Sequence, residues 1–212
     1  MKLLGISASP RKAATDYVVR EALRIAGEIA EVESEYISLR GKKLNFCIHC
    51  DHCIRKGECV HKDGMLEVYP LLIWADAIII GTPVYQGTVS GQAKVMMDRC
   101  RAIVAKDIHL LRGKVGAAIA VGGDRSGGQE IAIRTIIDFY LINEITPVGG
   151  GAFGANLGAV IWSKDKKAEG AAADSEGLKS VYKIVKRLVE VSSGGIIGCE
   201  YACTGLYSGD SA

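Results

Sequence analysis

The chain has 212 residues, a hydrophobic fraction of 49% and a formal net charge of +2. That length suits one domain with a substantial core, and the hydrophobic fraction excludes an intrinsically disordered chain. The near-neutral charge gives no support for a nucleic-acid binder, and no apolar run is long enough to span a membrane. The amino terminus lacks the apolar core of a signal peptide, so we expect a cytoplasmic protein without nucleic-acid or membrane partners.

Short apolar runs alternate with stretches of helical periodicity along most of the chain. Strands are predicted at residues 2–6, 32–39, 76–80, 114–121 and near 145–148. Helices are predicted from about Thr15, at 65–74, 92–104 and 129–142, and after an N-cap at Asp174 or Ser175. Strands that alternate with helices favour a parallel sheet covered on both faces. We therefore predict an α/β fold with a doubly wound, five-stranded parallel sheet in the flavodoxin-like order 2-1-3-4-5.

One domain, residues 1–191, accounts for all of these elements and includes a cysteine-rich inserted loop at 42–62. Residues 192–212 are rich in Gly and Ser, which predicts a flexible or peripherally docked tail. Cys199 and Cys203 lie in this tail; they are interpreted as incidental, with a reactive or ligating role as the alternative. Cys100 falls in a predicted helix beside two methionines, so it is expected in the core.

The loop after the first predicted strand carries the groups that bind a phosphate. Ser7, Ser9 and Thr15 supply hydroxyls and Arg11 supplies a positive charge, just before the amino terminus of a helix. The loop lacks the glycine pattern of a dinucleotide site and the Gly-Lys-Ser/Thr of a nucleoside triphosphate site, so a phosphomonoester is the better fit. The alternative is an ordinary strand-to-helix turn with a capping hydroxyl.

Two further loops follow the third and fourth predicted strands. In residues 81–90, Pro83 and the glycines predict a rigid turn, and Tyr85 is placed to lie along a flat ring. Residues 122–128 contain four glycines, which permit close approach of a ligand to the backbone. The alternatives are a rigid loop with Tyr85 in the core and a flexible connection. Because parallel strands release their loops at one edge, we expect all three loops to converge.

Taken in order, the three loops Ser-Ala-Ser-Pro-Arg, Gly-Thr-Pro-Val-Tyr-Gln-Gly and Gly-Gly-Asp-Arg-Ser-Gly-Gly-Gln resemble the NADPH-dependent FMN reductase branch of the flavodoxin-like proteins, over about residues 1–190. The resemblance implies that FMN is bound. It implies that the phosphate lies on Ser9, Arg11 and Thr15, with Asp16 and Tyr17 nearby. It implies that the ring is held by Pro83, Val84, Tyr85, Gln86, Gly87, Gly122, Gly123, Asp124 and Gly128. The chain has Ala13-Ala14-Thr15 where family members often have Asn or Gly-Asn-Thr, so the resemblance does not imply every phosphate or ribityl contact from that stretch.

Four of the seven cysteines lie within thirteen residues: Cys47, Cys50, Cys53 and Cys59. Reducing conditions in the cytoplasm argue against disulfides here, which leaves metal binding or redox chemistry. Three thiols two residues apart, with a fourth close by, can surround one cubane cluster. A two-cluster ferredoxin needs a second quartet, and the sequence has none.

Zinc is the competing interpretation of these cysteines. Structural zinc sites usually have two ligand pairs separated by a longer stretch, and three evenly spaced cysteines in seven residues are crowded for that arrangement. His49, His52 and His61 lie in the same segment and are zinc ligands by type, although exposed or second-shell roles suit them better. Free, inert thiols are the third alternative.

With this cysteine motif, the sequence resembles the iron–sulfur flavoproteins. The resemblance implies one 4Fe-4S cluster on Cys47, Cys50, Cys53 and Cys59 and one FMN per chain. It also implies assembly into a homodimer or homotetramer, with electron transfer between cluster and flavin across a subunit contact.

We therefore expect an FMN-dependent oxidoreductase that transfers electrons between the cluster and FMN. No side chain marks a general acid or base, so no catalytic residue is predicted. Reduced ferredoxin is the expected donor because the cysteine loop is basic, at Lys42, Lys43, Arg55, Lys56 and Lys62, although an ordinary solvated charged loop explains these residues equally well. Oxygen, peroxide or a quinone is the expected acceptor. Two alternatives remain: an NAD(P)H-dependent FMN or quinone reductase with structural zinc, and a non-enzymatic redox sensor.

Overall fold

The structure, a computed structural model, describes residues 1–194. Cys199 and Cys203 lie outside the described residues, as does most of the predicted tail. The division into a domain of 1–191 and a tail of 192–212 stays a prediction, although the last helix includes Ser192.

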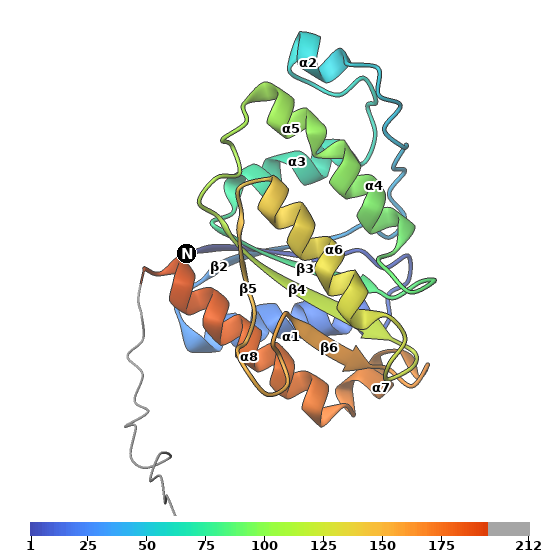
Figure 1. The fold of residues 1–212 in the computed structure, drawn as a ribbon, viewed down its shortest axis with the longest axis vertical. Helices are drawn as coiled ribbons and strands as arrows, with labels where there is room; N and C mark the ends of the chain where they lie inside the picture. Colours follow the sequence, from blue (N-terminus) through green and yellow to red (C-terminus); the bar gives the residue numbers. More distant parts are fainter. Residues whose placement is uncertain (195–212) are drawn as a thin grey trace, which may run out of the picture.

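A parallel sheet forms the centre of the molecule (Figure 1). Its strands, in the spatial order β2-β1-β3-β4-β5, are β2 (Glu33–Ser38), β1 (Lys2–Ser7), β3 (Ala77–Pro83), β4 (Val115–Gly122) and β5 (Thr146–Val148). All pairings are parallel, and every residue of β3 and β4 is buried. Continuous apolar runs form these central strands because helices cover both faces. The predicted fold and strand order are confirmed.

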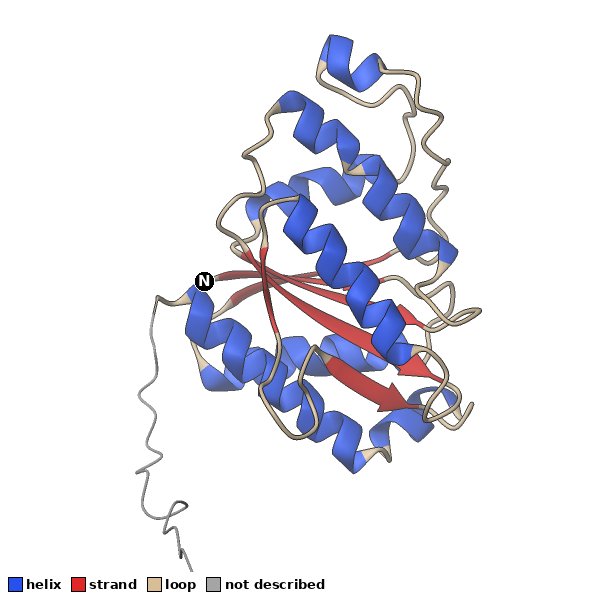
Figure 2. Cartoon of the chain, in the orientation of Figure 1, coloured by secondary structure: helices blue, strands red, loops and turns tan. Residues whose placement is uncertain are grey.

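A sixth strand, β6 (Ala159–Trp162), is present that the sequence reasoning missed. It pairs with Ile119–Gly122 in β4, whereas β5 pairs with Val115–Ala117 of the same strand. The last edge of the sheet is therefore shared by two short strands, as Figure 2 shows in red. A run of four apolar residues after Gly158 was the only sequence signal for β6, and four residues carry little periodicity.

Two layers of helices enclose the sheet (Figure 1). Three helices pack on one face: α1 (Ala14–Ile29), α7 (Lys167–Ala172) and α8 (Ser175–Ser192). Four lie on the other: α3 (Met65–Trp74), α4 (Gly91–Arg99), α5 (Arg101–Lys106) and α6 (Gln129–Ile142). A short helix inside the cysteine loop, α2 (His52–Lys56), packs against α5 at one end of the molecule.

Two local expectations need correction. The helix predicted at 92–104 is divided at Cys100, whose backbone N–H bonds to the carbonyls of both Met96 and Met97 at 3.1 Å. Asp174 stands at the N-cap of α8, but its carboxylate does not cap that helix. It instead accepts a hydrogen bond from the backbone N–H of Trp162 at 2.7 Å, so it joins α8 to β6.

Gly116 in β4 allows the ring of Tyr140 to lie against the sheet, where its hydroxyl donates to the carbonyls of Ile78 (3.2 Å) and Ala117 (2.9 Å). A Cβ at Gly116 would lie 2.7 Å from the nearest ring carbons of Tyr140. We expect Gly116→Ala to lower the free energy of unfolding by about 1–3 kcal/mol, because the core must shift to admit the methyl group. Urea denaturation would measure the change.

The matched control is Gly27→Ala in α1, where an added Cβ meets nothing within 4 Å. This control variant is expected to be about 0.5–1 kcal/mol more stable, because alanine is the better helix former. A Gly116→Ala variant as stable as the Gly27→Ala variant would contradict the packing described here.

Candidate functional site

Three loops meet in one polar cavity of about 80 Å³ at the carboxyl edge of the sheet. The first loop contributes Ser9, Arg11 and Thr15 to its lining. The complete lining is Ser9, Arg11, Ala13, Ala14, Thr15, Pro83, Val84, Tyr85, Val121, Gly123, Ser163, Asp165 and Lys167. An apolar groove on the helices is larger, so it is the convergence of polar groups rather than size that makes this loop cavity the candidate site.

Hydrogen bonds through Ser90 tie the first two loops together. Its buried hydroxyl donates to the carbonyl of Ala8 at 2.6 Å and accepts the N–H of Ala93 at 3.2 Å. Its own N–H donates to the hydroxyl of Thr82 at 3.0 Å, and Ala8 N–H donates to the carbonyl of Gly81 at 2.8 Å. The first loop is therefore held against the second by buried bonds, each worth about 1 kcal/mol.

Gln129 shapes the third loop from the first turn of α6. Its side chain accepts the N–H of Gly127 at 2.7 Å and donates to the carbonyl of Asp124 at 2.5 Å. Gly128 has φ +108°, and a Cβ there would stand 2.5 Å from the carbonyl oxygen of Gly87. Only glycine suits this position, where the second and third loops touch.

The structure brings some of the predicted FMN residues to the cavity and not others. Ser7 is buried at the end of β1 and does not line it. Asp16 faces away, because its carboxylate accepts hydrogen bonds from the Tyr36 hydroxyl and from Arg20 at 3.2 Å. Six further predicted residues lie outside the lining: Tyr17, Gln86, Gly87, Gly122, Asp124 and Gly128. Tyr17 belongs to α1 and is partly buried against the core.

Ser163, Asp165 and Lys167 line the cavity and were missed from the sequence. They follow β6, the strand that the pattern did not reveal. The hydroxyl of Ser163 donates to the carbonyl of Gly122 at 2.9 Å, which joins this segment to the third loop. A Cβ at Gly123 would lie 2.4 Å from the Asp165 carboxylate, so the two chains approach closely there.

The charge and the free backbone donors of the cavity fit a phosphate. Arg11 and Lys167 bring positive charge and Asp165 a negative one. Helix α1 begins after Ala13 without a side-chain cap, so its first N–H groups are available to an anion. Ala13 and Ala14 occupy the position where the sequence departs from the family pattern, and backbone donors remain there.

The cysteine loop lies beside α5, away from the loop cavity. Cys47 and Cys50 are exposed, Cys53 is buried and Cys59 is intermediate; all four are free thiols. Within residues 1–194, no three potential metal ligands are gathered closely enough to hold an ion. The donor set nevertheless fits a cluster by its chemistry, since four thiols alternate with residues of positive φ. His49 (52°) and Asp51 (54°) turn the backbone in the way that forms anion-binding nests around such clusters.

A buried ion pair closes the base of the cysteine loop. The Arg99 guanidinium donates to both oxygens of Asp63, at 2.9 and 3.1 Å, and to the carbonyl of Asn45 at 2.6 Å. Burial opposes ionisation of Asp63, but hydrogen bonds from Arg99 and from the N–H groups of Asn45 and Met65 hold its pKa well below its usual range. One ion pair thus joins the two ends of the loop.

Comparison with known proteins identifies the family to which the chain belongs. A model of the NADPH-dependent FMN reductase family matches residues 1–159. An iron–sulfur flavoprotein of Methanocaldococcus jannaschii is 60% identical over 192 residues, which cover 90% of this chain and 96% of the relative. The chain belongs to the NADPH-dependent FMN reductase family, in its iron–sulfur flavoprotein branch. An iron–sulfur flavoprotein of Archaeoglobus fulgidus is 52% identical over 89% of this chain and 96% of its own length.

Solved structures at low identity share the fold of this chain. A flavodoxin, WrbA-like protein from Agrobacterium tumefaciens has a TM-score of 0.62 at 16% identity, over 91% of this chain and 98% of its own. A flavone reductase has a TM-score of 0.66 at 19% identity, over 91% of this chain and 63% of its own. In residues 1–194 we find no helix with both the length and the apolarity that a membrane crossing requires.

The buried Arg99–Asp63 pair predicts a pH-dependent stability. At pH 7 we expect Asp63→Asn to lower the free energy of unfolding by about 3–5 kcal/mol, because the Arg99 charge loses its partner. The folded-state pKa of Asp63 is depressed. The unsubstituted protein is therefore more stable than Asp63→Asn above the unfolded-state pKa of Asp63, about 3.9, and this difference in unfolding free energy is lost as the pH falls through the folded-state pKa. Urea denaturation from pH 7 down to the acid limit would measure it.

Asp98→Asn is the control for this prediction, because Asp98 pairs with Lys94 at the surface. It is expected to leave the stability nearly unchanged at every pH. Equal effects of the two variants at pH 7 would contradict a buried pair at Asp63.

Proposed function

We propose that this protein is an electron-transfer flavoprotein that binds FMN at the loop cavity and a 4Fe-4S cluster on Cys47, Cys50, Cys53 and Cys59. One observation carries the proposal. A cavity with phosphate-binding groups at the carboxyl edge of a flavodoxin-like sheet occurs in the same chain as a free four-cysteine loop. Relatives called iron–sulfur flavoproteins align with 89–90% of this chain, so they span both features.

The described residues suggest how each end of FMN would be held. Arg11, the hydroxyls of Ser9 and Thr15 and the first N–H groups of α1 would bind the phosphate. Tyr85 and the tight contact between the second and third loops would border the ring, where a glycine backbone permits close approach. When bound, the cluster supplies one-electron transfer and the flavin one- or two-electron chemistry.

An acidic electron donor such as reduced ferredoxin is part of this proposal, with oxygen, peroxide or a quinone as the acceptor. The charge on the cysteine loop supports it only in part. Lys42 pairs with Glu67 at 2.6 Å and Lys62 pairs with Glu58 at 2.8 Å, while Arg55 donates to the carbonyl of Cys50 at 2.9 Å. Lys43 and Lys56 have no such pairing in the described chain and would face a docked partner. A cytoplasmic location would keep the four thiols reduced.

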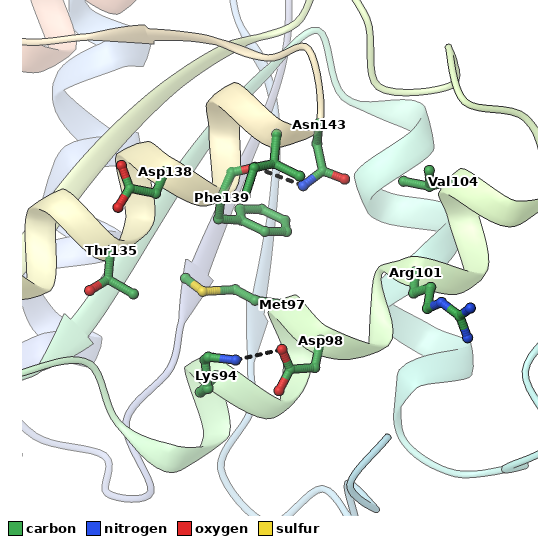
Figure 3. A pocket seen from close by; sticks show the side chains of 10 residues that line it. Lys94, Met97, Asp98, Arg101, Val104, Thr135, Asp138, Phe139 and Asn143 are labelled. Carbon is green, nitrogen blue, oxygen red and sulfur yellow. Dashed lines mark hydrogen bonds and ion pairs between the residues drawn. The ribbon is translucent and has the colours of Figure 1, made fainter. Parts of the chain in front are cut away.

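Association with further copies of the chain is also proposed, as a homodimer or homotetramer. An apolar groove of about 400 Å³ runs between α4–α5 and α6, where Met97 and Phe139 face each other (Figure 3). Ile142, which lines this groove, and its neighbour Leu141 are exposed on α6, and contiguous exposed apolar surface is typical of interfaces. Such a contact would let electrons pass between the cluster of one copy and the flavin of another.

The second candidate is an NAD(P)H-dependent FMN or quinone reductase whose cysteines hold structural zinc. The match to the NADPH-dependent FMN reductase model favours it. A non-enzymatic redox sensor is the third. Metal and sulfide analysis of anaerobically purified protein separates the first two candidates: iron with acid-labile sulfide supports the cluster, and zinc without sulfide supports the second candidate.

Removal of one loop cysteine is expected to remove the cluster. We expect Cys59→Ser to lose most of the iron and the broad visible absorbance that dithionite bleaches, and to keep its flavin, because the flavin cavity lies elsewhere in the fold. Cys100→Ala is the matched control, since burial raises the pKa of the Cys100 thiol to about 12 and makes it a core residue rather than a ligand. Full iron in Cys59→Ser would contradict the assignment.

The phosphate end of the flavin site is tested at Arg11. We expect Arg11→Ala to weaken FMN binding about 10- to 100-fold, the loss of one hydrogen bond to a charged group, measured by fluorescence titration of the apoprotein. Lys12→Ala removes the same charge from the neighbouring residue, which does not line the cavity, and is expected to change the affinity little. Equal losses in the two variants would indicate only a general charge effect.

A further inference from the structure

Arg99 is the one arginine whose side chain is enclosed at the base of the cysteine loop, with 1% of its surface exposed. Three of its hydrogen bonds reach the two ends of that loop. Two N–H groups meet the Asp63 carboxylate and one also meets the carbonyl of Asn45. Asp63 in turn accepts the backbone N–H groups of Asn45 at 2.9 Å and Met65 at 3.1 Å. The guanidinium therefore sets how far apart the two ends of the loop stand.

One donor of this guanidinium is left over. In the described chain, the Nε–H of Arg99 is buried and has no hydrogen-bond partner. A buried donor on a charged group costs more than about 1–3 kcal/mol when it stays unpaired, so native structures rarely leave one without a use.

Cys59 is a loop cysteine that lies close enough to Arg99 for their charges to interact. Cys59 and Tyr69 line the same groove beside α3 and α5, and the Tyr69 hydroxyl donates to the backbone carbonyl of Arg99 at 3.2 Å. Burial lowers the pKa of Arg99, but the bonds to Asp63 and the nearness of Tyr69 and Cys59 raise it above its ordinary value. Arg99 is thus a permanent cation close to the fourth cysteine.

We propose that Arg99 is a positioning residue for the cluster: it holds the cysteine loop closed through Asp63 and Asn45, and it reserves its Nε–H for the sulfur of Cys59. This inference rests on the proposed 4Fe-4S site. A buried cation and an N–H···S hydrogen bond both favour the more negative, reduced form of a cluster. Arg99 would accordingly raise the reduction potential as well as order the ligands.

The second arginine of this region, Arg101, would contribute less. It lies beyond the break at Cys100, and its side chain is about one-third exposed. Its guanidinium donates to Asp51 at 2.7 Å on the outer part of the loop. Water screens a charge in that position, so its effect on a nearby cluster is smaller.

The test compares Arg99→Lys, which keeps the charge and removes both Nε–H and the forked geometry, with Asp63→Asn, which keeps Nε–H and removes the opposing negative charge. In anaerobic holoprotein, the cluster potential is titrated and the Fe–S stretching bands are recorded by resonance Raman in H2O and D2O. We expect Arg99→Lys to shift the potential negatively by about tenfold in the equilibrium constant, about 59 mV for one electron, and to lose the deuterium sensitivity. We expect Asp63→Asn to shift it positively.

Opposite signs in the two variants separate this role from simple loosening of the loop, which would move both potentials alike. Arg112→Lys is the matched control, because Arg112 makes a similar forked contact with Glu144, at 2.9 and 2.7 Å, outside the cysteine loop. Its potential is expected to equal that of the natural chain. Unchanged potential and deuterium sensitivity in Arg99→Lys would overturn the proposal.

Failure to load the cluster is also informative. If Arg99→Lys takes up no iron, the sign of the shift in Asp63→Asn decides. If neither variant takes up iron but both bind as much FMN as the unsubstituted protein, the result supports the role of Arg99 in positioning the cysteine loop. If both variants also lose FMN, Arg99 acts only in general folding and the proposal is overturned. If the natural chain itself holds no iron and sulfide, the proposed function fails first, before Arg99 is tested.

Discussion

Parallel hydrogen bonding among β1, β3 and β4 determines where the polar loops of this protein lie. In the register, Ser7 stands beside Gly81 and Gly81 beside Ile119, so the three strands reach the same edge of the sheet almost together. The bond from Ser90 to Ala8 and the approach of Gly128 to Gly87 are possible only because the strands are aligned in this way. The cavity is a product of sheet register before it is a product of any one loop.

The sequence was sufficient for the central strands and the three loops because both depend on local patterns, and the handedness of the crossovers then limits the strand order. Short apolar runs such as Ile78–Ile80 predict buried strands, and Gly and Pro identify the turns that follow them. The same approach failed at β6. Four apolar residues after a glycine-rich stretch do not define a strand until β4 pairs with them. Because β6 was not predicted, the cavity residues that follow it, Ser163, Asp165 and Lys167, were not predicted either.

Charged side chains were harder to place than the backbone. The position of Asp16 near a predicted phosphate loop suggested a ligand contact, but Tyr36, twenty residues further on, binds its carboxylate. Arg99 and Asp63 are thirty-six residues apart, and no pattern separates Arg99 from the other 25 basic residues of the chain. The spacing of the cysteines identifies a ligand set because thiol chemistry is local. The ion pair that supports their loop is a tertiary contact, which only the folded chain reveals.

The division of the last sheet edge between β5 and β6 has a consequence for how copies of the chain can meet. Each of these strands offers only three or four residues of unpaired backbone, and at the other edge β2 presents exposed Glu33 and Glu35. Short or acidic edges resist the strand-to-strand pairing that leads to extended aggregates. Among the described residues, neither border of the sheet is therefore suited to continue into a neighbour, and the proposed association of copies would have to use the helical layers.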